Sequence, residues 1–375
     1  MARPLTYWDY IRVEDLCALQ SGSPADADAG AELSNSEHLF IVVHQVFELW
    51  FKMILRELDT IHDSLARNPV PEQDIAAAVY SLDRIAEILR LSSDHFRVME
   101  TLTTRDYLGF RDKLFPASGF QSAQLREIEI SLGLEPEQRL PFGADRDSWL
   151  RALEGPGGEE TPALKRIKAR LARGPSLREL LDDWLARTPI HGSTPDKPGD
   201  AEVVEGFLSS YVAGHERAIG RQLEIVRERS PGLSEEEMTE RYESQLASAR
   251  QWLGGTDVED EERPRRRRIR AAALFVMSYR ELPLLAWPRR LIDTIVEVEQ
   301  LFLIFRQRHA RMVERVIGRR VGTGGSAGVD YLDRTALEYR IFKDLWAVRT
   351  LLLGVADQPP VQNAELYGFQ SGGEA

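Results

Sequence analysis

The chain has 375 residues, a net charge of −12 and 43% hydrophobic residues, enough apolar content for a substantial buried core. The acidic balance speaks against a general nucleic-acid-binding protein, which would carry a basic surface. A single cysteine, Cys17, excludes an internal disulfide framework and a cysteine-rich zinc site. We find no apolar signal core at the N-terminus and no run long enough to cross a bilayer. A soluble, cytoplasmic protein is expected.

Helical periodicity dominates the sequence, and no segment shows the alternation of a strand. A short amphipathic helix is expected from Thr6 to Gly22, with a polar linker after it. Further helices are expected, in chain order, over 36–66, 72–101, 104–115, 123–134 and 176–187. Residues 201–253 return to helix, with a capping-box pattern at Ser234 and Glu237, and a final pair covers 290–318 and 332–353. The pattern predicts an all-α helical bundle.

An acidic run followed by a basic run, DVEDEERPRRRRIR, occupies residues 257–270. We interpret it as a solvated turn between helices, with a nucleic-acid-binding patch as the alternative. Residues 366–375 end in GFQSGGEA and are expected to form a disordered tail.

The segment 290–318 carries one continuous apolar stripe at helical spacing. Its members are Leu291, Ile295, Val298, Phe302, Phe305, His309, Met312 and Val316. The flanking side chains expected to face solvent are Arg306, Gln307, Arg308 and Arg311. A histidine in a core position is either hydrogen-bonded to a buried group or a metal ligand, and the stripe leaves both readings of His309 open.

A second histidine, His44, lies in the strongly apolar stretch HLFIVVHQVFELWFK (38–52). It borders a narrow polar strip and adjoins Phe40 and Phe47 on a helix. The strip consists of Gln45, Glu48 and Lys52. His44 is either a boundary residue bonded to a neighbouring helix or a polar group that orients a ligand in an apolar pocket.

Motifs of other chemistries are missing: we find no nucleophile elbow, Walker loop, zinc-binding helix motif or dinucleotide fingerprint. The glycine-rich GTGGSAG (322–328) follows the helix of His309 and carries the hydroxyls of Thr323 and Ser326. It is either a loop that closes over a ligand or a plain helix-terminating turn.

Six segments, taken in order, resemble the haem-dependent tryptophan 2,3-dioxygenase family. They are TYWDY (6–10), HLFIVVHQVFELWFK (38–52), DYLGFRDKLFPASGFQS (106–122), WLARTP (184–189), YRELP (279–283) and FRQRHARMVERVIGRRVGTGGSAG (305–328). The most specific features are F-x-x-x-H-Q-x-x-E-L-W, which begins at Phe40, and the fourteen-residue spacing from His309 to Thr323. The resemblance extends from about Thr6 to Leu353 and is looser over 135–270.

This resemblance implies a single all-helical haem domain over 1–375 that forms a homotetramer. Residues 1–35 would be an arm that contacts a neighbouring subunit, and 135–270 a divergent helical insert containing the charged helices. The implied cofactor is a b-type haem with ferrous iron bound by His309 and with Ser118 beside it. Dioxygen would be the co-substrate, and no reductase, membrane or nucleic acid is implied.

The resemblance also implies a substrate site. His44 would hydrogen-bond the indole N–H of L-tryptophan, in a positioning role at the catalytic centre. The other implied substrate contacts are Phe40 and Tyr107 around the indole, Arg111 at the carboxylate, Thr323 at the head group, and Tyr7 and Tyr10 from a neighbouring subunit. Arginine suits a carboxylate because its planar fork makes two parallel hydrogen bonds.

The implied reaction opens the pyrrole ring of L-tryptophan with dioxygen to give N-formyl-L-kynurenine, the first step of the kynurenine pathway of tryptophan catabolism. Three positions depart from the family pattern near the substrate: Trp8, Ala327 and Val329, and LLAW (284–287) departs from it elsewhere. One alternative is therefore an enzyme of the same scaffold that acts on a modified tryptophan or inserts a single oxygen atom. Another is a non-catalytic helical haem-binding protein.

Overall fold

The computed structural model confirms the all-α class. It describes residues 4–22, 30, 32–115, 117, 119–140, 148–229, 234–322 and 328–368. Within these ranges the regular elements are α-helices and short 3-10 helices, and pairing of the β type is confined to an isolated bridge between Ile190 and Ser193.

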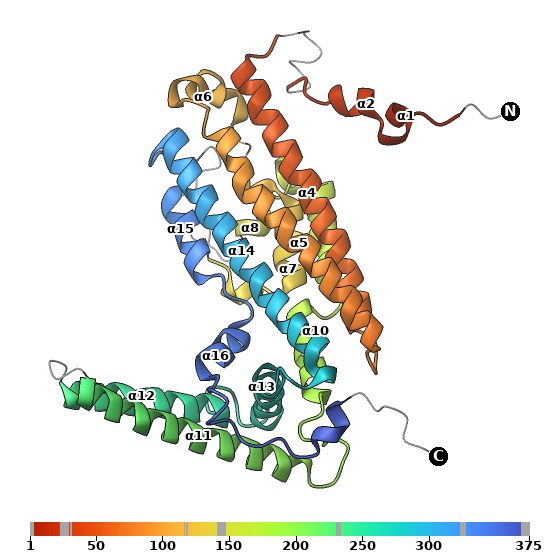
Figure 1. Cartoon of the computed structure of the whole chain (residues 1–375). Coiled ribbons are helices and arrows are strands. Elements are labelled where there is room, and N and C mark those ends of the chain that lie inside the picture. The colour runs from red at the N-terminus through yellow and green to blue at the C-terminus, as the bar shows by residue number, and fades with distance from the viewer. Residues whose placement is uncertain are drawn as a thin grey trace. The chain divides into compact units, whose positions relative to one another are not determined.

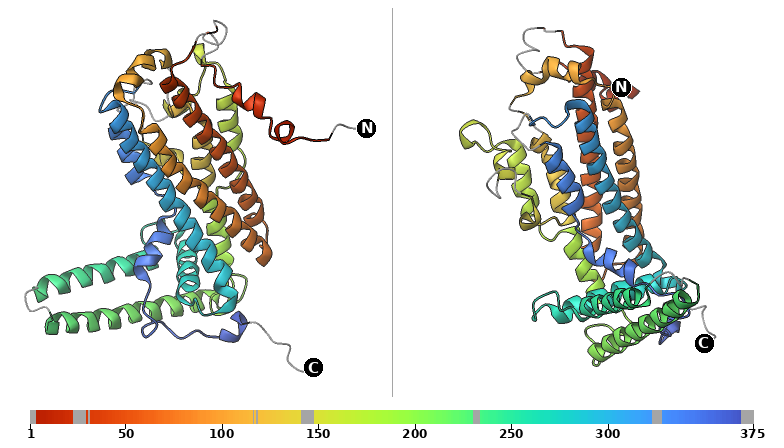
Figure 2. Two further views of the ribbon diagram at one scale, coloured as in Figure 1. Left: turned by 45° about the horizontal axis from the view of Figure 1, so that its top comes forward. Right: turned by 90° about the vertical axis from the view of Figure 1, so that its left-hand side faces the viewer.

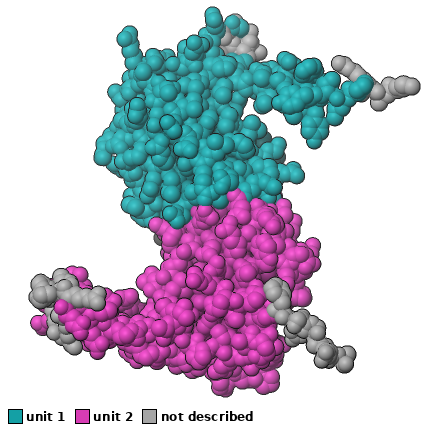
Figure 3. Space-filling model, viewed as in Figure 1, with its two compact units in different colours: residues 1–58, 84–174, 300–339 teal, residues 59–83, 175–299, 340–375 magenta. Residues whose placement is uncertain are grey.

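The chain divides into two compact units, coloured separately in Figure 3. Unit 1 comprises residues 1–58, 84–174 and 300–339, and unit 2 comprises 59–83, 175–299 and 340–375. Three long helices contribute residues to both units: α4 (Asn35–Leu65), α5 (Glu72–Met99) and α14 (Ala286–Ile317). Their predicted positions, 36–66, 72–101 and 290–318, are therefore confirmed to within a few residues.

Unit 1 is built around its parts of α4, α5 and α14, which lie side by side in Figures 1 and 2. The Phe47 ring is central to their packing, with its centroid 4.8 Å from that of Phe96 and 5.8 Å from that of Phe305. The shorter helices of this unit are α6 (Thr104–Phe110), α7 (Ala123–Leu132), α8 (Ser148–Arg151), α9 (Pro162–Leu171) and α15 (Val329–Glu338). Each apolar member of the predicted α14 stripe is buried, so that prediction is confirmed.

The N-terminal arm is helical, but it is not the single helix expected from Thr6 to Gly22. It forms α1 (Tyr7–Ile11) and α2 (Val13–Cys17), because Arg12 between them adopts the left-handed conformation with φ of 55°. A left-handed residue interrupts a right-handed helix. None of the residues in these two helices is buried.

Unit 2 contains α10 (Leu177–Arg187), α11 (Asp200–Arg229), α12 (Glu235–Gly254), α13 (Arg263–Ser278) and α16 (Lys343–Leu351). Helices α11 and α12 pack against each other as a hairpin (Figures 1 and 2). The Ser234 side chain accepts the backbone N–H of Glu237 at the start of α12, as the capping pattern predicted.

The interpretation of 257–270 as a solvated turn is confirmed for the acidic run, 257–262, and wrong for the basic run, 263–270. Arg263 begins α13, and the basic run forms its first two turns. Arg268 and Arg270 are only 7% and 3% exposed, and both are paired. Arg268 donates to the carbonyl oxygens of Ala186, Thr188 and Ser193, and Arg270 to the carboxylates of Asp257 and Asp344. These guanidinium groups hold unit 2 together and are not a surface for nucleic acid.

The helix expected over 332–353 is broken between α15 and α16. The carboxylate of Glu299 on α14 accepts the backbone N–H of Phe342 at 3.0 Å and also that of Ile341. It also accepts the indole N–H of Trp346. The first N–H groups of a helix need partners from outside it, and Glu299 supplies one to Phe342, the N-cap residue of α16, from a distant point in the sequence.

Helix α4 is long and apolar enough, by length and composition, to cross a membrane. The expectation that no segment meets this criterion is therefore wrong. Phe47 and Phe51 of this helix are buried, and Glu48 accepts hydrogen bonds from Ser122 and Gln124. These contacts place one face of α4 in the core of unit 1.

Candidate functional site

One cavity in unit 1 brings the two histidines singled out in the sequence together. Its volume is about 470 Å³, within the ~300–1,000 Å³ typical of ligand and cofactor pockets. Phe40 and His44 border it from α4, Tyr107 from α6, and Phe305 and His309 from α14. With Tyr331 of α15, two imidazoles and four aromatic rings of the described residues line one space.

His309 presents a neutral imidazole to this cavity. Burial, together with the neighbouring His44 and Arg306, lowers the pKa of His309 to about 4. Its ring stacks on Phe96, with the centroids 5.5 Å apart and the planes 9° from parallel. A neutral imidazole keeps a lone pair available for a metal ion, and the stacking restricts the direction in which the ring points.

The cavity suits a haem better than a bare metal ion. In the described part of the chain, no three His, Cys, Asp or Glu side chains come together as a metal-binding group. A porphyrin supplies its own in-plane ligands, so one axial histidine is sufficient to hold its iron. The neutral His309 and the aromatic lining match that requirement.

His44 presents a hydrogen-bond acceptor. Its Nδ1 lies 2.7 Å from the carbonyl oxygen of Phe40, and because a carbonyl only accepts, Nδ1 carries the proton. The pKa of His44 is lowered by burial, although the Phe40 contact and the nearby Glu48 act in the opposite direction. The ring has accessible surface where it borders the cavity, yet protein surrounds it densely enough to favour the neutral form. Its Nε2 therefore carries the free lone pair.

Tyr107 and Arg111 lie next to each other. Tyr107 is 8% exposed, and its ring centroid is 6.2 Å from that of Phe40. Burial raises the pKa of Tyr107, and the charge of Arg111 partly offsets this. Arg111 is not among the residues that border the cavity; its Nη2 donates to the carbonyl oxygen of Val321 at 2.8 Å. Its Nε is buried without a hydrogen-bond partner in the protein.

Several polar residues at the cavity were not singled out from the sequence. Ser122 and Arg126 border it, and the Ser122 hydroxyl donates to Glu48 at 2.6 Å. Arg306 was expected to face solvent, and this is wrong: it is 8% exposed and donates to Glu129 at 2.6 Å. Arg306 lies three residues before His309, so both side chains share one face of the helix. This spacing is the sequence feature that could have identified Arg306 as a residue of the cavity.

Of the remaining predicted site residues, the two described tyrosines lie away from the cavity. Tyr7 and Tyr10 are 71% and 76% exposed on α1 and do not border the cavity. Ser118 and Thr323 fall outside the described residues, so the structure gives no position for either.

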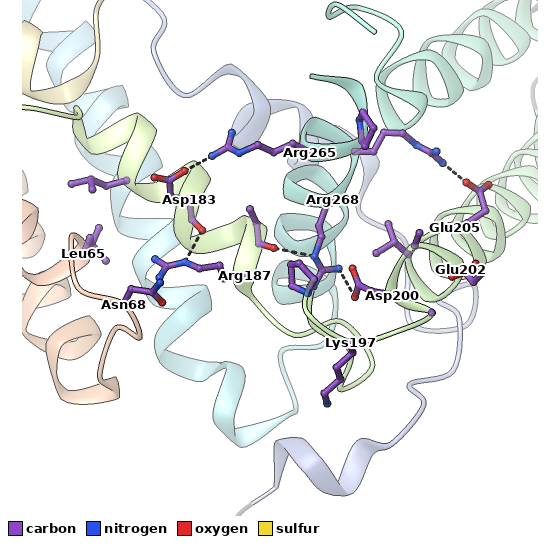
Figure 4. A pocket seen from close by; sticks show the side chains of 18 of the residues that line it. Leu65, Asn68, Asp183, Arg187, Lys197, Asp200, Glu202, Glu205, Arg265 and Arg268 are labelled. Carbon is purple, nitrogen blue, oxygen red and sulfur yellow. Dashed lines mark hydrogen bonds and ion pairs between the residues drawn. The ribbon is translucent and has the colours of Figure 1, made fainter. Parts of the chain in front are cut away.

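A second cavity, of about 880 Å³, lies in unit 2. Its described lining contains no histidine and no aromatic side chain. Its charged groups are largely paired with one another, as Arg265 is with Asp183 and Arg268 with Asp200 (Figure 4). Although it is the larger space, its described lining lacks the imidazoles and aromatic rings that border the unit 1 cavity.

Comparisons with known proteins identify the family of this chain. The family described as tryptophan 2,3-dioxygenase matches residues 1–352. A protein of Sorangium cellulosum named tryptophan 2,3-dioxygenase is 51% identical over 99% of this chain and 89% of its own length. A tryptophan 2,3-dioxygenase 2 of Ralstonia nicotianae is 49% identical over 98% of both chains.

A shorter relative from Xanthomonas campestris, named tryptophan 2,3-dioxygenase-like protein, is 50% identical over 72% of this chain and 98% of its own length. The family match and the two similarities over nearly the whole chain confirm the resemblance seen in the sequence. The chain belongs to the tryptophan 2,3-dioxygenase family.

Proposed function

We propose that this protein is a haem-dependent dioxygenase that cleaves the indole pyrrole ring of L-tryptophan to give N-formyl-L-kynurenine. The observation that carries the proposal is the pairing of two neutral imidazoles, His44 and His309, at one aromatic cavity. Membership of the tryptophan 2,3-dioxygenase family supports both the substrate and the reaction.

His309 is the residue that would bind the iron of a b-type haem. The bound haem would supply the activation of dioxygen. Both oxygen atoms enter the product, so the reaction consumes no net electrons and needs no reductase. Phe96 holds the plane of the His309 ring, and Phe305 fills space beside it.

The chain's own residues orient the amino acid. The Nε2 lone pair of His44 accepts the indole N–H, while Phe40 and Tyr107 provide aromatic surface around the ring. Arg111 binds the carboxylate with its guanidinium, whose Nε–H has no partner in the protein. Binding both ends of the substrate holds its reacting carbons in a fixed orientation. Orientation of this kind is a main contribution of a protein to a reaction whose chemistry a cofactor supplies.

Four further roles follow the family pattern and belong to the same proposal. Thr323 contacts the amino-acid head group, and Ser118 lies beside the haem. Tyr7 and Tyr10 complete the pocket of a neighbouring subunit, which suits their high exposure on the arm. The assembly is then a homotetramer, and the enzyme acts in the cytoplasm.

The product's mass tests the reaction. Purified protein is reduced under argon, mixed with L-tryptophan and exposed to isotopically labelled dioxygen, with unreduced protein as the control. The proposal expects a ring-opened, formylated product that contains two labelled oxygen atoms. One labelled atom would identify a mono-oxygenase of the same scaffold, and a lack of oxygen uptake by haem-loaded protein would identify a non-catalytic haem protein.

A further inference from the structure

Four ionised side chains form a buried cluster in the wall of the unit 1 cavity. Glu129 on α7 is 0% exposed, and Arg126, Arg139 and Arg306 around it are 6%, 5% and 8% exposed. Arg126 Nη1 lies 3.1 and 3.0 Å from the two carboxylate oxygens, and Arg306 Nη2 lies 2.6 Å from one of them. Arg139 donates to the same carboxylate. We call these four residues the arginine cluster.

The arginine cluster carries a surplus of positive charge. Burial alone would raise the pKa of Glu129, but the charges of the three arginines hold it below its usual range. Glu129 is therefore ionised, and arginine stays protonated in proteins. Three positive charges against one negative charge leave two positive charges in a region that is poorly hydrated, where charges act more strongly than at a surface.

Two members of the cluster border the cavity. They are Arg126 and Arg306, and Arg306 lies three residues before His309 on α14. Its guanidinium also packs 4.5 Å from the ring centroid of Phe302. Glu129 and Arg139 do not border the cavity, and Arg139 instead lies 4.4 Å over the ring of Trp149. Glu129 therefore acts on the cavity through the arginines that it holds.

We propose that Glu129 is a positioning residue that sets the reduction potential of the haem iron by partly neutralising Arg126 and Arg306 at the cavity wall. The inference rests on the proposed function, because it needs a haem on His309. Positive charge in the wall favours ferrous over ferric iron, since the ferric state carries one more positive charge. Glu129 limits that effect while it keeps the two arginines in place.

Two substitutions of opposite sign test this proposal by spectroelectrochemical titration of the purified holoenzyme. Glu129→Gln increases the surplus from two charges to three and should raise the midpoint potential. Arg139→Gln reduces the surplus from two charges to one and should lower it. Each change is expected to alter the ferrous-to-ferric ratio at a fixed potential on the order of tenfold, which corresponds to about 59 mV for one electron.

Glu57→Gln is the matched control. Glu57 is 6% exposed in unit 1, pairs with Arg84 and does not border the cavity. This variant also removes a buried carboxylate from an arginine, so it should lose stability while its haem potential stays at the wild-type value. A structural disturbance alone would move all three variants in the same direction.

Opposite shifts in Glu129→Gln and Arg139→Gln, with no shift in Glu57→Gln, would support the proposal. Equal signs or unchanged potentials in the first two would overturn it. If Glu129→Gln does not fold, Arg139→Gln decides alone: a lower potential supports the role, and an unchanged or higher one contradicts it. Wild-type protein that cannot bind haem would contradict the proposed function itself. Haem-loaded variants whose midpoint potentials equal that of the wild type would contradict only the role of Glu129.

Discussion

The Nδ1 atom of His44 lies 2.7 Å from the carbonyl oxygen of Phe40, four residues earlier in α4. This contact assigns the proton to Nδ1 and the lone pair to Nε2, because the carbonyl oxygen can only accept. Burial keeps the ring neutral by lowering the pKa of His44. A helix thus fixes an uncharged acceptor at the edge of an aromatic cavity, as an indole N–H requires.

Replacing His44 with alanine should weaken this one contact. A hydrogen bond of this kind contributes about 0.5–1.5 kcal/mol, so tryptophan affinity is expected to fall about three- to tenfold while haem content stays constant. Spectral titration of the variant measures both quantities. The control ligand is the benzothiophene analogue of tryptophan, in which sulfur replaces the indole N–H. An equal loss of affinity for both ligands would contradict the assigned contact.

The His44 contact also predicts a pH dependence. The pKa of His44 lies below its ordinary value of 6.5, so the ring is neutral and can accept a hydrogen bond at and above that pH. Protonation at more acidic pH removes the lone pair. Tryptophan affinity should therefore be constant from pH 6.5 to mildly alkaline solution and decrease as the solution becomes more acidic. The decrease of affinity at acidic pH should be missing in His44→Ala. A wild-type affinity that decreases as the pH rises from 6.5 would contradict the assignment.

Periodicity predicted the long helices because apolar residues recur along them at helical spacing. The apolar residues of the predicted α14 stripe, from Leu291 to Val316, are all buried, although other positions of the helix are buried as well. Periodicity could not predict the break before α16, because the carboxylate that accepts the N–H groups of Ile341 and Phe342 there is that of Glu299, more than forty residues earlier. The prediction of a solvated turn failed over residues 263–270 for the same reason. The burial of these arginines depends on carbonyls and carboxylates that only the fold brings near them.

Arg111 provides a test of the carboxylate contact. Its Nε is buried without a partner, so Arg111→Ala should remove the group that binds the substrate carboxylate. A charge-assisted hydrogen bond contributes about 1.5–3 kcal/mol, and tryptophan affinity should fall roughly ten- to hundredfold. Tryptamine lacks the carboxylate and should bind the variant and the wild type equally. A matching loss of tryptamine affinity would mean that Arg111 shapes the pocket without binding the carboxylate.

The buried end of the basic run gives a stability prediction. Arg268 is 7% exposed and donates to three backbone carbonyls, so Arg268→Met should lower the free energy of unfolding by about 3 kcal/mol. Urea unfolding curves measure this change. Arg265→Met is the control, because Arg265 pairs with Asp183 while both side chains are about half exposed. Its effect should stay below about 1 kcal/mol, and equal losses in the two variants would contradict the structural role of Arg268.

The sequence predicted residues of the candidate site where a polar side chain falls within the apolar stripe of a predicted helix. His44 and His309 are polar groups in apolar stripes, and both border the cavity. Arg306 was missed because charge normally indicates solvent exposure, and its partner Glu129 lies in a different helix. No local pattern marks three arginines that converge on one carboxylate.

The most direct test of this account is whether His309 holds the haem. His309→Ala, His95→Ala and wild-type protein would be purified in parallel and their Soret absorbance compared per chain. His95 is the matched control, because it lies in unit 1 with a pKa lowered by burial but does not border the cavity. We predict that the Soret band is lost in His309→Ala alone and returns when free imidazole and haem are added. A full Soret band in His309→Ala without added imidazole would contradict the account.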